Sequence, residues 1–186
     1  MLQPTKVVIM KIFLSCMTFV LLGSGLYSQA IASEARLPAN VQLSWNYLND
    51  FTGTMQVHRL KDDTKVSLWE MGVRDNVDST PAGVEIAEGK LELMPGVINQ
   101  LVLVMSNKTS ETMYFHVPLH QPDPGVGYMG IHFMCLCFDG VVYIVPSGKT
   151  WFRVVEIRMD EERKGGDMTI FPHDVIALTE EQISKL

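Results

Sequence analysis

The sequence is poor in cysteine and lacks clustered basic residues, and both shortages restrict what the protein can be. Its 186 residues include three cysteines, too few for a disulfide scaffold. Fifteen Lys and Arg against 21 Asp and Glu give a net charge of −6, without the basic block that neutralises nucleic-acid phosphates. We therefore expect no nucleic-acid partner. With 47% hydrophobic and 19% charged residues, the chain is unlike a disordered or collagen sequence and is predicted to form one globular domain.

The N-terminal segment carries an apolar run that is short for a membrane span. Two lysines precede the run at 12–22, and a small-residue pattern follows it at 30–32. This order is typical of a secretory signal, with cleavage after Ala32. A spanning helix needs about 20 residues, and the run at 12–22 is shorter, which favours a cleaved signal. An uncleaved anchor in the inner membrane is the alternative. We expect a signal peptide at 1–32 and one exported, periplasmic domain at 33–186.

After residue 40 the sequence alternates short β-prone runs with turn signals, and it has little helical periodicity until its last residues. Prolines and glycines at 120–127 predict a loop, Asp139-Gly140 predicts a tight hairpin, and 179–182 resembles a capping box that opens a short C-terminal helix. Short strands at this spacing predict an all-β, antiparallel β-sandwich. The expected strands are 41–47, 54–59, 66–69, 89–94, 99–106, 112–117, 130–138, 141–145, 150–159 and 168–171.

Cys135 and Cys137 are the only cysteines left once the signal peptide is removed. Side chains alternate between the faces of a strand, so both thiols are expected on one face of the strand at 130–138, beside Ile131 and Phe133. Residues i and i+2 lie about 6.5 to 7 Å apart at their Cα atoms, at or beyond the limit for a disulfide. A shared soft metal ion is easier to accommodate than a bond between the two sulfurs.

Copper fits this pair of thiols best among the soft metals. Structural zinc would need two more ligands, and iron–sulfur clusters generally need four cysteines. Cu(I) accepts two or three soft ligands, so Cys135 and Cys137 are predicted to bind Cu(I). Two protomers could also share one copper site through four sulfurs, which would make the protein a homodimer.

Histidines near the cysteines are candidate auxiliary ligands. His116 and His120 would share a face if their strand continued through Pro118. His132 and Met134 are expected on the face opposite the thiols unless a bulge intervenes. Ordinary hydrogen bonding is the competing interpretation for each histidine.

Three other functions remain open on the residues alone. Both cysteines could be buried as small hydrophobes in a β-sandwich that binds a partner without metal. A cupredoxin-like electron carrier would need two His, one Cys and a weak axial Met, but no histidine follows Cys137 until His173. Cys137 as a catalytic nucleophile would need a positioned base. No known hydrolase or protease motif is present, so we do not expect an enzyme.

Residues 95–160 share a further order of motifs with a known family. Pro95-Gly96 precedes an apolar strand, an Asn-Ser type turn follows at 106–110, and an aromatic-x-Val-x-Pro-like segment lies at 114–118. Tyr128 then precedes Cys135-Leu136-Cys137-Phe138, and Pro146-Ser147-Gly148 comes after it. This order resembles the CtaG family of cytochrome c oxidase assembly proteins, with its Cys-Phe-Cys-Phe strand and following Pro-Gly turn.

The resemblance implies both a fold and an acceptor for the copper. It implies an immunoglobulin-like (cupredoxin-like) β-sandwich that holds Cu(I) on Cys135 and Cys137. It further implies transfer of that copper, by exchange of thiolate ligands, to the copper B site of cytochrome c oxidase subunit I. The protein would then associate with membrane proteins.

Overall fold

The structure is a computed structural model that describes residues 37–119, 130–134, 141–163, 166 and 168–185. Burial alternates along its first strand, β1 (Ala39–Leu48): Ala39, Val41 and Leu43 are buried, whereas Asn40 is exposed. A period of two in burial is the pattern of a strand with one face against a core. The predicted signal peptide, the loop at 120–127 and the hairpin at Asp139-Gly140 lie outside the described residues.

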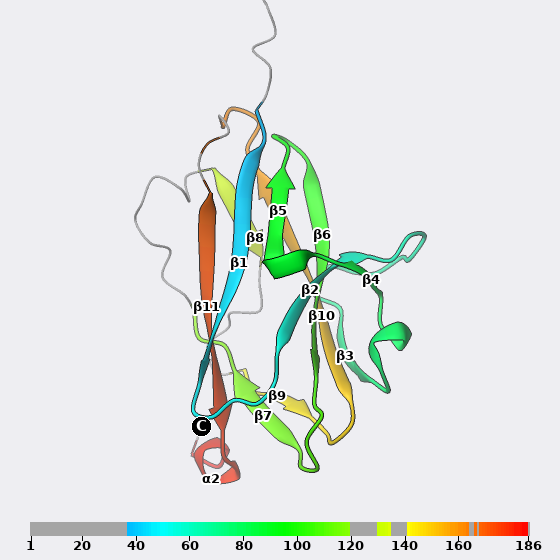
Figure 1. The fold of residues 1–186 in the computed structure, drawn as a ribbon, viewed down its shortest axis with the longest axis vertical. Coiled ribbons are helices and arrows are strands. Elements are labelled where there is room, and N and C mark those ends of the chain that lie inside the picture. Colours follow the sequence, from blue (N-terminus) through cyan, green and yellow to red (C-terminus); the bar gives the residue numbers. More distant parts are fainter. Residues whose placement is uncertain (1–36, 120–129, 135–140, 164–165, 167, 186) are drawn as a thin grey trace, which may run out of the picture. The chain divides into compact units, whose positions relative to one another are not determined.

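The described strands form two sheets (Figure 1). The first, called here the β1 sheet, has the order β5-β1-β11-β7-β9, and the second, the β10 sheet, has the order β3-β10-β6-β2-β4, with β8 also paired to β10. The β1 sheet contains β5 (Lys90–Leu93), β1, β11 (Thr169–Leu178), β7 (Met113–His116) and β9 (Tyr143–Val145). The β10 sheet contains β3 (Met71–Arg74), β10 (Thr150–Met159), β6 (Ile98–Ser106), β2 (Met55–Leu60), β4 (Ala82–Glu85) and β8 (Ile131–Met134).

The helices are short. Two 3₁₀ turns, η1 (Val77–Ser79) and η2 (Ala87–Gly89), flank β4, and the α-helix α2 (Glu180–Ile183) follows β11. Thr179 and Gln182 cap α2 reciprocally, as the sequence predicted. The prediction of an all-β sandwich with a short C-terminal helix is therefore confirmed.

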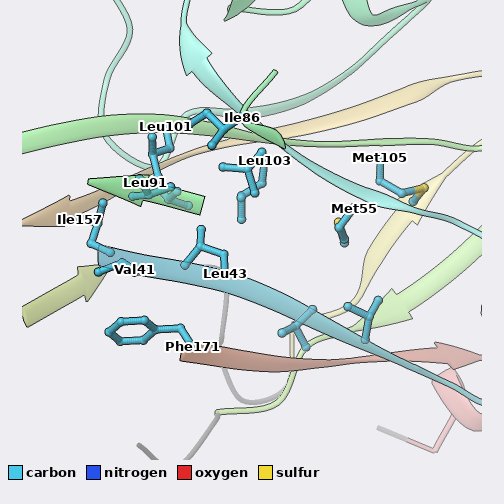
Figure 2. Close-up of a cluster of buried hydrophobic side chains, with 14 of the residues drawn as sticks. Val41, Leu43, Met55, Ile86, Leu91, Leu101, Leu103, Met105, Ile157 and Phe171 are labelled. Carbon is cyan, nitrogen blue, oxygen red and sulfur yellow. The ribbon is translucent and has the colours of Figure 1, made fainter. Parts of the chain in front are cut away.

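The inner faces of the two sheets pack against each other to form the main core. Figure 2 shows Val41 and Leu43 of β1 and Leu101 and Leu103 of β6 within one buried cluster. Farther along the same core the rings of Phe115, Tyr143 and Trp151 meet, with centroids 4.9 to 5.4 Å apart. Aromatic pairs at such separations add to the burial free energy, so this cluster anchors the sandwich.

Strand β11 is longer than expected. The sequence predicted a strand only at 168–171, yet β11 continues through Pro172 to Leu178. It runs parallel to β1, with Pro172 opposite Ser44. A proline is tolerated where its nitrogen faces an edge without a ladder partner, and among the described strands β7 joins β11 only from Ile176 onward.

The strand expected at 66–69 is a turn instead. The Glu70 N–H donates to the Ser67 carbonyl (3.0 Å), and Trp69 has a left-handed backbone with φ of 72°. A left-handed residue interrupts the extended backbone of a regular strand. The strand begins after the turn, as β3, and pairs with β10.

The turn predicted at 106–110 is held by one buried side chain. The Asn107 amide donates to the carbonyls of Glu111 (2.7 Å) and Val145 (2.8 Å), and its oxygen accepts the Thr109 N–H (3.0 Å). Every polar atom of this side chain has a partner, which is what allows it to be buried. Asn107 thereby joins the end of β6 to the end of β9.

Candidate metal site

Strand β8 carries the chain toward the predicted metal ligands. It pairs antiparallel with β10, with Ile131 opposite Met159 and Met134 opposite Glu156. Ile131 is buried in the main core, and Phe133 packs against it. The odd-numbered side chains of β8 therefore face the core. Cys135 and Cys137 follow directly and lie outside the described residues.

The even-numbered side chains of β8 lie on the other face, as the sequence predicted. His132 is exposed, and its Nε2 lies 2.9 Å from Oδ1 of Asp160. Met134, two residues farther on, is half-buried. His132 thus belongs to a surface pair, on the face opposite Ile131 and Phe133.

Along the edge opposite β6, strand β10 has two successive partners, and the change comes near Val154. Its last residues, 156–159, pair with β8, and its first, 150–153, pair with β3. Between them the Val154 N–H donates to the Glu70 carbonyl (2.8 Å), and the Trp69 N–H donates to the Val154 carbonyl (3.2 Å). Both backbone groups of Val154 are used by this turn, so Val154 offers no ladder hydrogen bond to β8.

A buried histidine of the β1 sheet faces β8. His173 in β11 has 0% exposure. Its ring stands edge-on to the Phe133 ring, with centroids 5.5 Å apart and planes at 90°, and lies 4.9 Å from the Trp45 ring. Its Nδ1 lies 3.0 Å from the Phe171 carbonyl oxygen. A carbonyl only accepts, so Nδ1 carries a proton in this hydrogen bond.

His173 is not among the metal ligands that the sequence predicts. The expected strand ended at residue 171, so the histidine was not placed on any face. The signal that could have found it is the alternation of Phe171, His173 and Val175, which puts the histidine on the same face as two apolar neighbours.

A buried arginine lies on the inner face of β10. Arg153 alternates with Trp151 and Val155 and is 7% exposed. Its Nη1 donates to the Tyr143 hydroxyl (2.7 Å), and its guanidinium carbon lies 5.1 Å from the centre of the Trp69 ring. A guanidinium is always charged, so this part of the sandwich interior carries a positive charge that favours a nearby anion.

The two predicted auxiliary histidines are not brought together within the described residues. His116 lies in β7, opposite Ile176 of β11, and is half-buried. Its neighbours Phe115 and Val117 are fully buried, so His116 faces away from the core that contains Phe133. His120 lies outside the described residues.

In residues 37–119, 130–134, 141–163, 166 and 168–185, no three His, Cys, Asp or Glu side chains are grouped to hold a metal ion. Within those ranges the chain also forms no helix with the length and apolarity to cross a membrane.

Comparison with known proteins assigns a family. No curated protein and no solved structure is significantly similar to the chain. A family model described as Domain of unknown function (DUF8709) matches residues 39–178, which run from the first residue of β1 to the last residue of β11. Because this match covers most of the chain and all its described strands, the chain belongs to the family described as Domain of unknown function (DUF8709).

Proposed function

We propose that the protein is an exported Cu(I) carrier that holds copper on Cys135 and Cys137 and delivers it to a respiratory oxidase. The alternation of β8 is the observation that carries the proposal, because Ile131 and Phe133 both face the main core. Strand alternation applied to the sequence predicts that Cys135 and Cys137 share this face. Two thiolates on one face form a donor set that suits Cu(I).

The surroundings of that face favour a thiolate–copper complex. Phe133 meets Phe171 and His173 of the opposite sheet at ring-centroid distances of 5.9 and 5.5 Å. Aromatic walls of this kind exclude water, which strengthens electrostatic interactions inside.

Delivery would proceed by ligand exchange, without a change in oxidation state. A ligand of the acceptor binds the Cu(I), one cysteine thiolate leaves, and the second thiolate leaves when the next acceptor ligand has bound. The resemblance to the CtaG family suggests cytochrome c oxidase subunit I as the acceptor. The protein then works in the periplasm, in contact with membrane proteins, and a copper shared by two protomers would make a homodimer.

An anaerobic Cu(I) titration of the reduced full chain against a competing chelator tests the binding site. We expect specific binding that is lost in the double variant Cys135→Ser/Cys137→Ser. The matched control is Cys16→Ser, which removes a thiol from the predicted signal segment and should leave the stoichiometry unchanged. Unchanged copper binding in the double variant would show that the site is elsewhere. Absence of specific binding by the wild type would favour an interaction domain with structural cysteines.

Two further measurements separate a transfer site from packing. Thiols of a transfer site should react with a mild alkylating reagent in the folded protein and be protected by Cu(I), whereas inert core thiols should not react. In cells that lack the protein, delivery to subunit I predicts an oxidase without copper B. An oxidase with normal copper B would exclude that acceptor.

A further inference from the structure

We infer that the bare edge of β1, residues Ser44 to Leu48, is a docking site for an extended, basic peptide segment of a partner protein. The segment adds to the β1 sheet as a further strand. A strand edge without a neighbour is a template for another strand, and peptide binding by strand addition is a recurring mode of recognition. The inference goes beyond copper binding, since it uses no residue of the proposed copper site.

Strand β5 covers only the first part of this edge of β1. Residues 39–42 of β1 pair with β5, and Figure 1 shows β5 beside that part of β1. On its other edge β1 pairs with β11 along 41–48. Within the described strands, residues 44–48 therefore have a ladder on the β11 side and none on the β5 side.

The chain that precedes β5 turns away from β1 at Gly89. This residue has a left-handed backbone, with φ of 63°, and a Cβ atom on it would lie 2.5 Å from the Leu43 carbonyl oxygen. A glycine is required for so close an approach. The chain before it crosses to the other sheet, where the Ile86 N–H donates to the Val57 carbonyl at 2.7 Å. This crossing segment closes one end of the bare edge.

The backbone groups of Trp45 point out of the bare edge. Along a strand, the N–H and C=O groups of successive residues point alternately to its two edges. The Leu43 carbonyl points toward Gly89 on the β5 side, so the N–H and C=O of Trp45, two residues farther on, point to that side as well. Within the described residues, the ladder of β5 does not reach Trp45. One residue of an added antiparallel strand would use both groups.

A cleft of about 410 Å³ lies beside the bare edge, between β1 and β2. Its lining includes the half-buried Trp45 and the buried Met55, Val57 and Ile86. Beyond Trp45, the Tyr47 hydroxyl accepts the Met55 N–H at 2.8 Å and joins the two strands. Residues directly opposite each other in a ladder share a face. The peptide residue opposite Trp45 would therefore direct its side chain into the cleft, where we expect an apolar group.

The charges of the cleft favour a basic peptide. Glu85 and Glu88 belong to its lining, whereas no described Lys or Arg does. Lys90 pairs with Glu88, but Glu85 accepts from the neutral amide of Gln56, at 3.1 Å. A Lys or Arg beside the apolar position would be attracted to Glu85, and an acidic peptide would be repelled.

A second copy of the chain fits this edge less well than a single peptide. If residues 44–48 of two copies paired antiparallel about a two-fold axis, residues 39–42 of each would lie opposite residues 50–53 of the other. Strand β5 occupies the same edge at 39–42, so it would meet the turn that follows β1 in the other copy, at Asn49 and Asp50. A peptide strand carries no such neighbour and can lie in line with β5.

Amide exchange on the metal-free full chain tests the docking site. The probe is a hexapeptide of alternating lysine and valine with blocked ends, and the control peptide has glutamate in place of lysine. By NMR of ¹⁵N-labelled protein, we expect the lysine peptide to slow exchange of the Trp45 amide at least about tenfold. The amides of Ser44 and Asn46, which face β11, should keep their rates, and the glutamate peptide should have no effect.

Two results would overturn the inference. One is an unchanged Trp45 exchange rate at about 1 mM lysine peptide. The other is a Trp45 amide that is already protected in the free protein. Protection that grows with protein concentration would identify a second copy of the chain as the occupant.

Charge reversal tests the position of the peptide. Glu85→Lys should weaken binding of the lysine peptide at least about tenfold and allow the glutamate peptide to bind. Glu92→Lys is the matched control, since Glu92 is also exposed but does not line the cleft. Equal effects of the two variants would reflect net charge alone and contradict the assigned site. Both variants should bind Cu(I) like the wild type, so failure of the docking site and failure of the copper site are separate results.

Discussion

The two faces of the β10 sheet are both buried, but by different means. The inner face packs against a second sheet, through Leu101, Leu103 and Met105 of β6. The outer face carries a smaller cluster, in which Val102 and Val104 pack with Ala82, Phe152, Leu60 and Val77. The chain from the end of β2 to the start of β4, called here the outer cover, buries this cluster. A strand that is apolar on both faces, as β6 is, thus indicates a second layer even when the layer is a turn-rich segment.

Among the described residues, one buried histidine also lies at each face of the β10 sheet. His58 of β2 lies on the outer face, and His173 of β11, in the β1 sheet, packs toward the inner face; both place Nδ1 3.0 Å from a backbone carbonyl oxygen. The two histidines differ in their neighbours, because His173 faces the Phe133 ring, whereas His58 lies opposite Val102 across the ladder.

The largest expected difference between the faces comes from removing one phenylalanine ring from the packing at each. Phe115 of β7, whose ring meets Trp151 of β10 in the main core, and Phe152 of β10, in the outer cluster, are both fully buried. Phe115→Ala should lower the free energy of unfolding by about 3–5 kcal/mol, because its ring contacts belong to two packed sheets. Phe152→Ala should lower it by less, because a segment of turns can collapse into the cavity more easily than a sheet can.

Chemical denaturation with matched m-values measures both changes. The wild type and the conservative variants Phe115→Leu and Phe152→Leu are the controls, since leucine keeps most of the apolar volume. An equal or larger decrease in the free energy of unfolding for Phe152→Ala would show that the outer cover is as rigid as the sheet-on-sheet core. The predicted difference between the two faces would then be wrong.

The fold was predictable where the signals were local. Alternation and turn residues located β1, β6 and β10, and the Thr179–Gln182 pattern located the capping of α2. What the sequence did not reveal depends on partners distant along the chain. Strand β11 continues past Pro172 because β1, more than a hundred residues earlier, pairs with it, and β4 is a strand because it lies on β2.

The candidate site divides in the same way. The alternation of Ile131, His132 and Phe133 followed from their sequence and is found in β8. His173 was missed because its face is defined only when β11 is known to extend beyond Pro172. The turn of Trp69 and Glu70 onto Val154 was also unpredictable, because it uses backbone groups that any residue could supply.

A medium effect is expected at the rim of the inner face, where Tyr47 joins β1 to β2. Its hydroxyl accepts the Met55 N–H at 2.8 Å. Burial raises the pKa of Tyr47 above 10.0, although the Met55 hydrogen bond opposes this. The phenol is therefore held neutral in the fold, and its contribution to stability is present below the unfolded-state pKa and lost as pH rises through the folded-state pKa.

Tyr47→Phe separates these two contributions. At neutral pH the variant should lose about 1 kcal/mol, because Met55 loses its acceptor. Above pH 10 the wild type should lose stability more steeply than the variant, which has no phenol to ionise at this position. Urea denaturation at both pH values measures the change, and parallel alkaline slopes would mean that Tyr47 is not the group responsible.

The smallest effect is expected where the outer cover meets solvent. Lys149 donates to Asp75, just after β3, and this hydrogen bond together with the attraction of its charge lowers the pKa of Asp75. A lowered pKa contributes stability that is present above the unfolded-state value and lost as pH falls through the folded-state value. Both side chains are exposed, so water and salt screen the pair.

Asp75→Asn should therefore unfold at the wild-type denaturant midpoint at neutral pH and physiological salt, and differ only in acid at low ionic strength. A loss comparable to that of Phe152→Ala would mean that charge, and not the apolar cluster of Val102, Val104 and Phe152, holds the cover on the outer face.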